Sequence, residues 1–211
     1  TSSKADNIDE YLETIVQKED GLFYMYDGEE RPLETKTITI NYKHVTSLAS
    51  QDFTIYRSHH GPIIRAQDGK WTAFRIMEEP LKALQQSYLR TKAEDYQAYR
   101  ESMEFHTNSS NNTVYADADG AIAYFHSNFV PVRNESIDFS RPVDGSSSDT
   151  EWNGLHTIDE SVHILNPTNG WIQNTNNWPF SATGSNSPRK EDFPTYMSQN
   201  VENARGLHAL K

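Results

Sequence analysis

The first third of the chain is divided into short segments in which apolar and polar residues alternate. In Ile8–Val16, the side chains of Tyr11, Glu13 and Ile15 fall on one face of an extended chain. Thr35–Tyr42 alternates most strictly, so we expect a strand with one buried face. Turn-forming residues separate the segments, which predicts neighbouring antiparallel strands. Further expected strands are Gly21–Tyr26, Asp52–Arg57, Ile63–Arg65 and Trp71–Arg75.

Helical spacing replaces this alternation after residue 78. Pro80 is suited to a helix N-terminus, and Leu81, Leu84 and Tyr88 then recur at helical spacing. Thr91–Glu94 has the form of a capping box and predicts a second helix, with Tyr96, Tyr99 and Met103 on one face. The sequence therefore predicts one α+β domain over residues 1–211, an antiparallel sheet with packed helices within residues 79–106.

Residues 113–126 are typical of a β-hairpin, because two apolar segments flank Asp119-Gly120, a favoured two-residue turn. The last segment, Glu202–Leu210, predicts the beginning of another helix.

The charge balance excludes several classes of partner. The chain carries a formal charge of −11 and has a pI near 5.1, which argues against binding to nucleic acid or to an anionic membrane surface. It has no cysteine, which excludes disulfide scaffolds and thiol catalysis and is compatible with export. No apolar run approaches the ~20 residues of a membrane span.

Two short clusters have both a structural and a functional interpretation. Asp6, Asn7 and Asp9 crowd the start of the first strand. The two Asp side chains and one backbone carbonyl offer oxygen atoms to Ca²⁺, but they amount to only about half of the 6–8 ligands that it needs. A solvated acidic turn is the alternative. His59 and His60 are adjacent, and adjacent residues on an extended chain face opposite ways, which argues against a joint role.

The stretch Gly170–Phe180 contains three asparagines in four positions followed by Pro179. Asn is poor inside helices and strands but suits turns, where its amide bonds to nearby backbone. This pattern is typical of a fixed loop at a strand end, either a surface turn or a loop that aims amide donors into a cleft.

The same stretch, Gly170-Trp-Ile-Gln-Asn-Thr-Asn-Asn-Trp-Pro179, resembles a signature of the penicillin acylase family, amidases of the N-terminal-nucleophile (Ntn) hydrolase class. The resemblance implies a four-layer αββα sandwich and places the side-chain amide of Asn176 in the oxyanion hole. One such donor contributes ~3–4 kcal/mol to the stabilisation of a tetrahedral intermediate.

Other segments resemble the family in the same order, and together they span essentially the whole chain. The two matching segments nearest the C-terminus, residues 187–194 and 203–206, are closest to the branch that hydrolyses acyl-homoserine lactones and lipopeptides. The matching segments are residues 6–11, 57–62, 115–124, 142–154, 166–167, 187–194 and 203–206.

The resemblance also assigns roles to individual positions. Arg205 corresponds to an arginine near the active site, and the backbone N–H of Ser2, or of an adjacent residue, to the second oxyanion donor. Asp6, the carbonyl group of Ile8, and Asp9 correspond to part of a calcium site, whose remaining ligands include one from a separate small chain. The expected location is periplasmic or secreted.

The family's nucleophile lies several dozen residues before its acidic segment, whereas Thr1 lies five residues before Asp6. We therefore do not expect Thr1 to be the nucleophile. The expectation is a β-chain fragment that lacks the nucleophile segment and the small chain, inactive alone, from an acylase of small acyl amides (an acyl-homoserine lactone, a lipopeptide or a β-lactam side chain). The alternative is a non-catalytic, calcium-stabilised binding or structural module.

Overall fold

The computed structural model describes residues 7–199 and 201–211, which form two compact units. The first, the sheet unit, comprises residues 8–76 and 136–151. The second, the mixed unit, comprises the other described residues, namely 7, 77–135, 152–199 and 201–211. The prediction of one domain over residues 1–211 stays a prediction. No helix within the described residues is long and apolar enough to cross a membrane.

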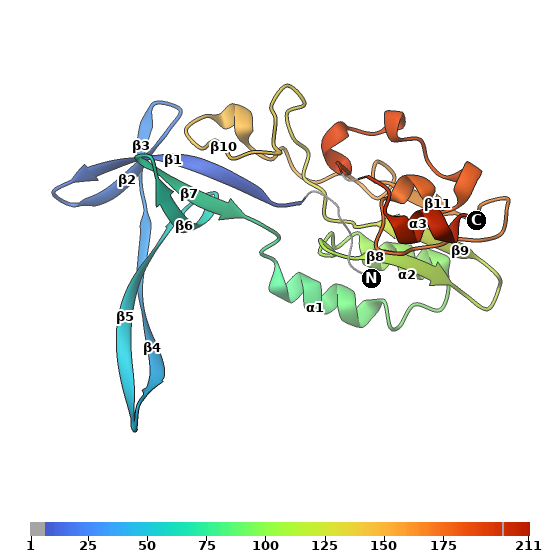
Figure 1. Cartoon of the computed structure of the whole chain (residues 1–211), viewed down its shortest axis with the longest axis horizontal. Helices are drawn as coiled ribbons and strands as arrows, with labels where there is room; N and C mark the ends of the chain where they lie inside the picture. Colours follow the sequence, from blue (N-terminus) through green and yellow to red (C-terminus); the bar gives the residue numbers. More distant parts are fainter. Residues whose placement is uncertain (1–6, 200) are drawn as a thin grey trace. The chain divides into compact units, whose positions relative to one another are not determined.

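The sheet unit is built on one large sheet with the order β3-β2-β1-β7-β6-β5-β4 (Figure 1). Neighbouring strands along this path are antiparallel, and the two-residue strand β10 adds a short parallel pairing with β1. The predicted strands are all present. Their bounds are β1 (Asp9–Lys18), β2 (Gly21–Tyr26), β3 (Glu29–Pro32), β4 (Glu34–His44), β5 (Ser47–Ser58), β6 (Gly61–Gln67), β7 (Lys70–Arg75) and β10 (Val143–Asp144), with a 3₁₀ turn η1 (Ser148–Thr150).

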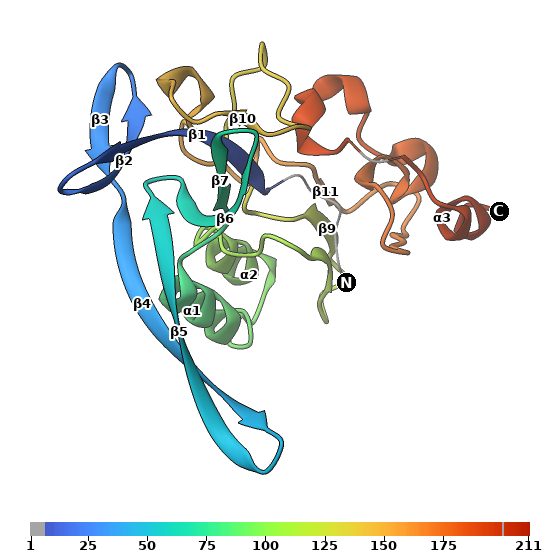
Figure 2. The same cartoon turned by 60° about the vertical axis from the view of Figure 1, so that its left-hand side comes forward.

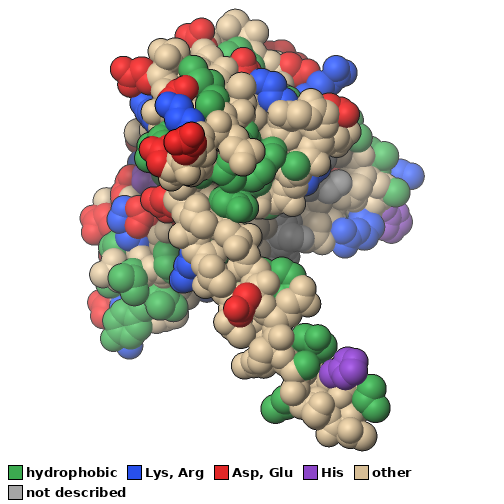
Figure 3. Space-filling model, turned by 90° about the vertical axis from the view of Figure 1, so that its left-hand side faces the viewer, with side chains coloured by type: hydrophobic (Ala, Val, Ile, Leu, Met, Phe, Trp, Pro, Cys, Tyr) green, Lys and Arg blue, Asp and Glu red, His purple; other side chains and the backbone are tan. Residues whose placement is uncertain are grey.

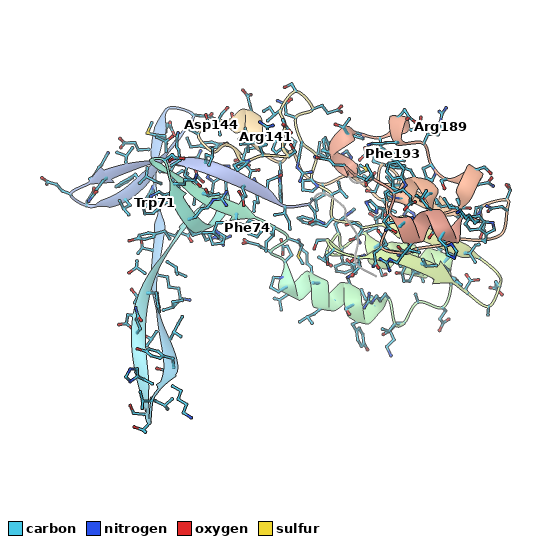
Figure 4. All side chains as sticks on the ribbon, in the orientation of Figure 1. Trp71, Phe74, Arg141, Asp144, Arg189 and Phe193 are labelled. Atoms are coloured by element: carbon cyan, nitrogen blue, oxygen red, sulfur yellow. The ribbon has the colours of Figure 1, made fainter. Side chains whose placement is uncertain are left out.

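The core of the sheet unit lies around β1, β2 and β7. Tyr11 on β1 packs with Ala73 on β7 and with Val143, and all three are less than 7% exposed. Trp71, labelled on β7 in Figure 4, packs against Tyr56 of β5 with ring centroids 5.1 Å apart. Burial of these aromatic and aliphatic side chains gives this part of the sheet its stability.

The hairpin β4–β5 continues beyond this core as a two-stranded ribbon (Figures 1 and 2). Its register pairs Ile38 with Phe53 and places both on the same face as Ile40. The opposite face is polar, and there the Thr39 hydroxyl donates a hydrogen bond to Asp52 at 2.7 Å. The ribbon is therefore amphipathic.

The apolar face of the ribbon is open to solvent. Ile40, Tyr42, Phe53 and Ile55 are 41–48% exposed, and Figure 3 shows apolar side chains along the projecting ribbon. The expected strand at Thr35–Tyr42 is confirmed, but the prediction that it buries one face is wrong, because the described residues do not cover that face.

The mixed unit contains a small antiparallel sheet in the order β11-β9-β8, with helices and 3₁₀ turns around it. Its strands are β8 (Asn112–Ala116), β9 (Ile122–His126) and β11 (His163–Leu165). Its helices are α1 (Pro80–Leu89), α2 (Tyr96–Met103) and α3 (Ala204–Ala209). Its 3₁₀ turns are η2 (Pro179–Ser181), η3 (Gly184–Asn186), η4 (Lys190–Asp192) and η5 (Thr195–Met197).

Helix α2 buries its predicted apolar face against the β8–β9 hairpin. Met103 packs on Ala123 and Phe125, and Tyr96 and Tyr99 flank this contact. In the C-terminal segment, Phe193 (Figure 4) packs against Phe180, with ring centroids 6.1 Å apart.

Two local predictions for the mixed unit are wrong. The cap of α2 is Asp95, whose carboxylate accepts a hydrogen bond from the Ala98 N–H at 2.8 Å, so the capping box at Thr91–Glu94 does not begin the helix. The β8–β9 hairpin is not closed by a two-residue turn at Asp119-Gly120. Its last pair is Ala116 with Ile122, and the carboxylate of Asp117 stabilises the longer connection by accepting from the Ala121 N–H.

Candidate active site

The asparagine stretch forms a tight corner, here called the asparagine corner (residues 174–177), just before η2. Asn176 has a φ of 60°, in the left-handed region that Asn tolerates better than most residues. The Asn174 side-chain oxygen accepts from the Asn176 N–H, and the Asn177 side-chain oxygen accepts from the Thr175 N–H, both at 3.0 Å. These amide-to-backbone bonds explain why Asn is used at several of these positions.

Asn177 is the buried anchor of the asparagine corner. Its side chain is 2% exposed, and its Nδ2 donates to the hydroxyl of Ser181 at 2.9 Å and to the carboxylate of Glu202 at 3.0 Å. Ser181 also donates to Glu202. The corner is thereby tied to the segment that leads into α3.

Helix α3 is held against the asparagine corner by its own cap and by a glycine. The Asn203 side-chain oxygen accepts from the Gly206 N–H at 2.9 Å, and its Nδ2 donates to the carbonyls of Thr175 and Asn176 at 3.4 Å. A Cβ atom at Gly206 would lie 2.0 Å from a carboxylate oxygen of Glu202. A larger residue at this position would therefore displace the Glu202 carboxylate from its contacts with the corner.

Arg205 on α3 contacts Asn176 directly, because its Nη2 donates to the Asn176 Oδ1 at 3.0 Å. A guanidinium has only donors, so the oxygen end of the carboxamide must face Arg205 and the NH₂ end must point to the other side. The two residues singled out in the sequence are brought together. Asn176 is half-buried and Arg205 is exposed. Ser2 lies outside the described residues.

A second layer, behind the corner, was not anticipated from the sequence. The Asn112 Nδ2 donates to the Asn174 side chain at 3.3 Å and to the Asn177 carbonyl at 3.4 Å, and its Oδ1 accepts from His126 Nδ1 at 2.7 Å. Burial lowers the pKa of His126 to about 4, so its ring is neutral at pH 7. Asn112 and His126 are paired across β8 and β9, and a polar cross-strand pair in an apolar hairpin is the signal that the sequence offered.

Comparison with known proteins decides the family. The family model described as penicillin amidase matches residues 1–209. The chain belongs to the penicillin amidase family.

Relatives within the penicillin amidase family share the fold. Penicillin G acylase of Escherichia coli is 26% identical over 183 residues, which is 85% of this chain. The solved structure of a thermostable penicillin G acylase from Alcaligenes faecalis superposes with a TM-score of 0.74 at 26% identity, again over 85% of this chain. The predicted α+β class with an antiparallel sheet is confirmed.

The chain spans 21% of the length of the E. coli relative and 32% of the A. faecalis chain. Members of the penicillin amidase family to which it is similar are thus several times longer.

The residues expected to bind calcium are only partly within the described chain, because Asp6 lies outside it. The carboxylate of Asp9, at the start of β1, is 2% exposed, whereas Ile8 is 46% exposed. A buried carboxylate and a neighbouring carbonyl suit a hard cation, but they are two donors where Ca²⁺ takes 6–8. These residues fit part of a calcium site.

The prediction that His59 and His60 face opposite ways is wrong. Strand β5 ends at Ser58, so the two histidines lie in the turn before β6 rather than on an extended strand. Their ring centroids are 3.8 Å apart, and both rings contact Glu151. Glu151 follows them by about 90 residues, and no motif in the sequence indicated that contact.

Proposed function

We propose that this chain is part of an acylase that hydrolyses the amide bond of a small acyl amide. Membership of the penicillin amidase family supports amide hydrolysis as the reaction class. An acyl-homoserine lactone, a lipopeptide or a β-lactam side chain is the proposed substrate. The nucleophile, a free N-terminal residue, would come from a segment preceding the matched region, and the small chain would be the partner.

In this proposal Asn176 donates a hydrogen bond to the oxyanion of the tetrahedral intermediate. The observation that carries it is the contact between Arg205 and the Asn176 Oδ1, because that contact fixes which end of the carboxamide is the donor. A fixed donor gains strength as negative charge develops on the substrate oxygen and needs no reorganisation at that moment. Arg205 is a positioning residue in this scheme.

The test is Asn176→Ala in the full-length acylase. Loss of one oxyanion donor should lower kcat ~100-fold or more, with a much smaller change in KM. Asn111→Ala, at an exposed asparagine of the same unit, is the control and should leave kcat unchanged. A loss of less than tenfold for Asn176→Ala would contradict the oxyanion role.

Arg205→Lys separates orientation from charge. Lys keeps the positive charge but not the planar guanidinium. If Arg205 acts by orienting the Asn176 amide, kcat should fall, and adding Arg205→Lys to Asn176→Ala should cost little more. Additive losses would mean that Arg205 acts independently of Asn176.

We also propose that Asp9 and the carbonyl group of Ile8 supply part of a structural calcium site, completed by ligands outside the described residues. Calcium titration of the full-length protein should raise its melting temperature, and Asp9→Asn should abolish that shift. An unchanged shift in Asp9→Asn would exclude this site.

We also propose that the protein is periplasmic or secreted, and cell fractionation tests that location.

A further inference from the structure

A compact group of polar side chains in the sheet unit is not used by the proposed amidase chemistry. We call it the histidine cluster, and its members are Glu13, Tyr24, Ser58, His59, His60, Arg75 and Glu151. All of them belong to the sheet unit. The histidine cluster shares no residue with the asparagine corner or with Arg205.

The backbone directs both histidine rings to the same place. Gly61 has a φ of 144°, and a Cβ atom there would lie 2.1 Å from the Phe74 carbonyl oxygen, so the turn packs closely against β7. The Nε2 atoms of His59 and His60 lie 2.7 Å and 2.9 Å from the same oxygen, Oε1 of Glu151. Two imidazole nitrogens and one carboxylate oxygen thus meet at one point.

The other nitrogen of each ring is also held. His60 Nδ1 lies 2.9 Å from Glu13 Oε1, and His59 Nδ1 lies 2.9 Å from the Tyr24 hydroxyl. Histidines that ligate metals typically use the second ring nitrogen in this way, often toward a carboxylate, which fixes the ring and exposes the other nitrogen to the metal. The Tyr11 ring stacks on His60 with centroids 3.8 Å apart and restricts its rotation.

The charges in the histidine cluster favour an added cation. Glu13 is completely buried, and its Oε2 has no hydrogen-bond partner within the described residues. Arg75 is paired with Glu151 Oε2 at 2.6 Å, so the histidine cluster contains two carboxylates and one guanidinium. His60 is flanked by both carboxylates, Glu13 at Nδ1 and Glu151 at Nε2, which favours a cation at this position.

We propose that His59, His60 and Glu151 bind one divalent transition-metal ion, with Zn²⁺ the best match, and that water completes its coordination. Two imidazoles and a carboxylate suit Zn²⁺ better than Ca²⁺ or Mg²⁺, which prefer oxygen ligands. Tetrahedral bonds of ~2.1 Å separate ligand atoms by ~3.4 Å, so the present contacts of 2.7 and 2.9 Å need to open by ~0.5–0.7 Å. The side chains of His59 and Glu151 are 28% and 19% exposed, which provides room and access for the ion.

The test is isothermal titration calorimetry of the full chain with Zn²⁺, after a chelator has removed any bound metal. We expect about one equivalent to bind, and His59→Ala to weaken that binding at least ~10-fold. Because His59 is exposed, this variant should fold normally. The control is His44→Ala, which removes an exposed histidine from β4 and should leave the affinity unchanged. Equal affinity of the wild type and His59→Ala, or an equal loss in His44→Ala, would overturn the proposal.

Co²⁺ supplies a second readout of the same site. Bound Co²⁺ should give the visible absorption of a tetrahedral ion with nitrogen ligands, and excess Zn²⁺ but not Ca²⁺ should abolish it. Tyr24→Phe removes the hydroxyl that contacts His59 Nδ1 and accepts from the His59 N–H, and we expect it to weaken binding ~10-fold. Displacement of Co²⁺ by Ca²⁺ would show that the ligands are oxygen atoms elsewhere and would refute the site.

Discussion

The asparagine corner and the histidine cluster both fix polar side chains through hydrogen bonds, but they do so with different chemistry. The corner uses mostly neutral amides, and its key contacts come from residues 174–177 and a helix fewer than 35 residues away. The cluster uses carboxylates, histidines and an arginine drawn from β1, β5, β7 and residue 151. A neutral network can present a donor to a substrate, whereas a buried charged network requires compensation inside the protein.

The two histidines that anchor these regions show the same contrast. Burial alone lowers the pKa of His126 behind the corner, whereas hydrogen bonds to two carboxylates raise the pKa of His60 in the cluster.

The largest expected effect is in the histidine cluster. Glu13→Ala would leave His60 and Ser58 without their buried acceptor, and loss of one partner of a buried charged pair typically costs ~3–5 kcal/mol. Urea denaturation should therefore show a loss of that size in the free energy of unfolding. Glu10→Ala, which removes a partly exposed ion pair with Arg65 from the same strand, is the control and should cost less than ~1 kcal/mol. Equal losses would mean that the cluster is no more sensitive than the surface.

The second effect is a pH dependence in the mixed unit. The folded pKa of His126 is about 4 and the usual value is 6.5, so the unfolded chain binds the extra proton first as the pH falls. This contribution is complete above pH ~6.5, and ~3 kcal/mol of stability should be lost as the pH falls to ~4. His126→Gln keeps a donor for Asn112 but cannot titrate. The difference in unfolding free energy between wild type and variant should therefore shrink or invert with acidification, and a constant difference would contradict the buried neutral ring.

The third effect isolates the anchor of the asparagine corner. Asn177→Ala removes a buried donor to Ser181 and to the charged Glu202, which should destabilise the protein by ~2 kcal/mol. Asn111→Ala, at an exposed position, should change stability by less than ~0.5 kcal/mol. Chemical denaturation of both variants measures the difference, and a value near zero for Asn177→Ala would show that the corner does not depend on this anchor.

The smallest effect is expected for His59→Ala in the absence of metal. Its bond to Glu151 is partly exposed, and such pairs contribute less than ~1 kcal/mol. A loss as large as that of Glu13→Ala would make His59 a structural element rather than an available ligand. Thermal melts with and without a chelator distinguish these cases.

Much of the fold was predictable because the local spacing of apolar residues indicates strands and helices. The strands of the sheet unit and the apolar face of α2 followed from alternation and helical spacing. Asn176 and Arg205 were singled out through a family pattern, and the structure added the contact between them.

The histidine cluster could not be predicted in the same way. Whether His59 and His60 diverge or converge depends on whether they lie on a strand or in a turn, and that depends on where β5 ends. Glu13 gave the one local signal, an acidic residue between Tyr11 and Ile15 on the same face of a strand. Its partner His60 lies 47 residues away, and the contact exists only after the sheet has formed. The open face of the β4–β5 ribbon was likewise unpredictable, since alternation does not say whether anything covers the apolar side.

The contact between Arg205 and the Asn176 Oδ1 has a consequence for the ageing of the protein. Hydrolysis of the Asn176 side-chain amide to aspartate would turn the carboxamide into a carboxylate, and Arg205 would hold that product at least as firmly as the original amide. The damaged molecule would remain folded while an anion replaced the proposed donor. Old preparations would then accumulate folded molecules that are heavier by about one mass unit and lack the proposed donor.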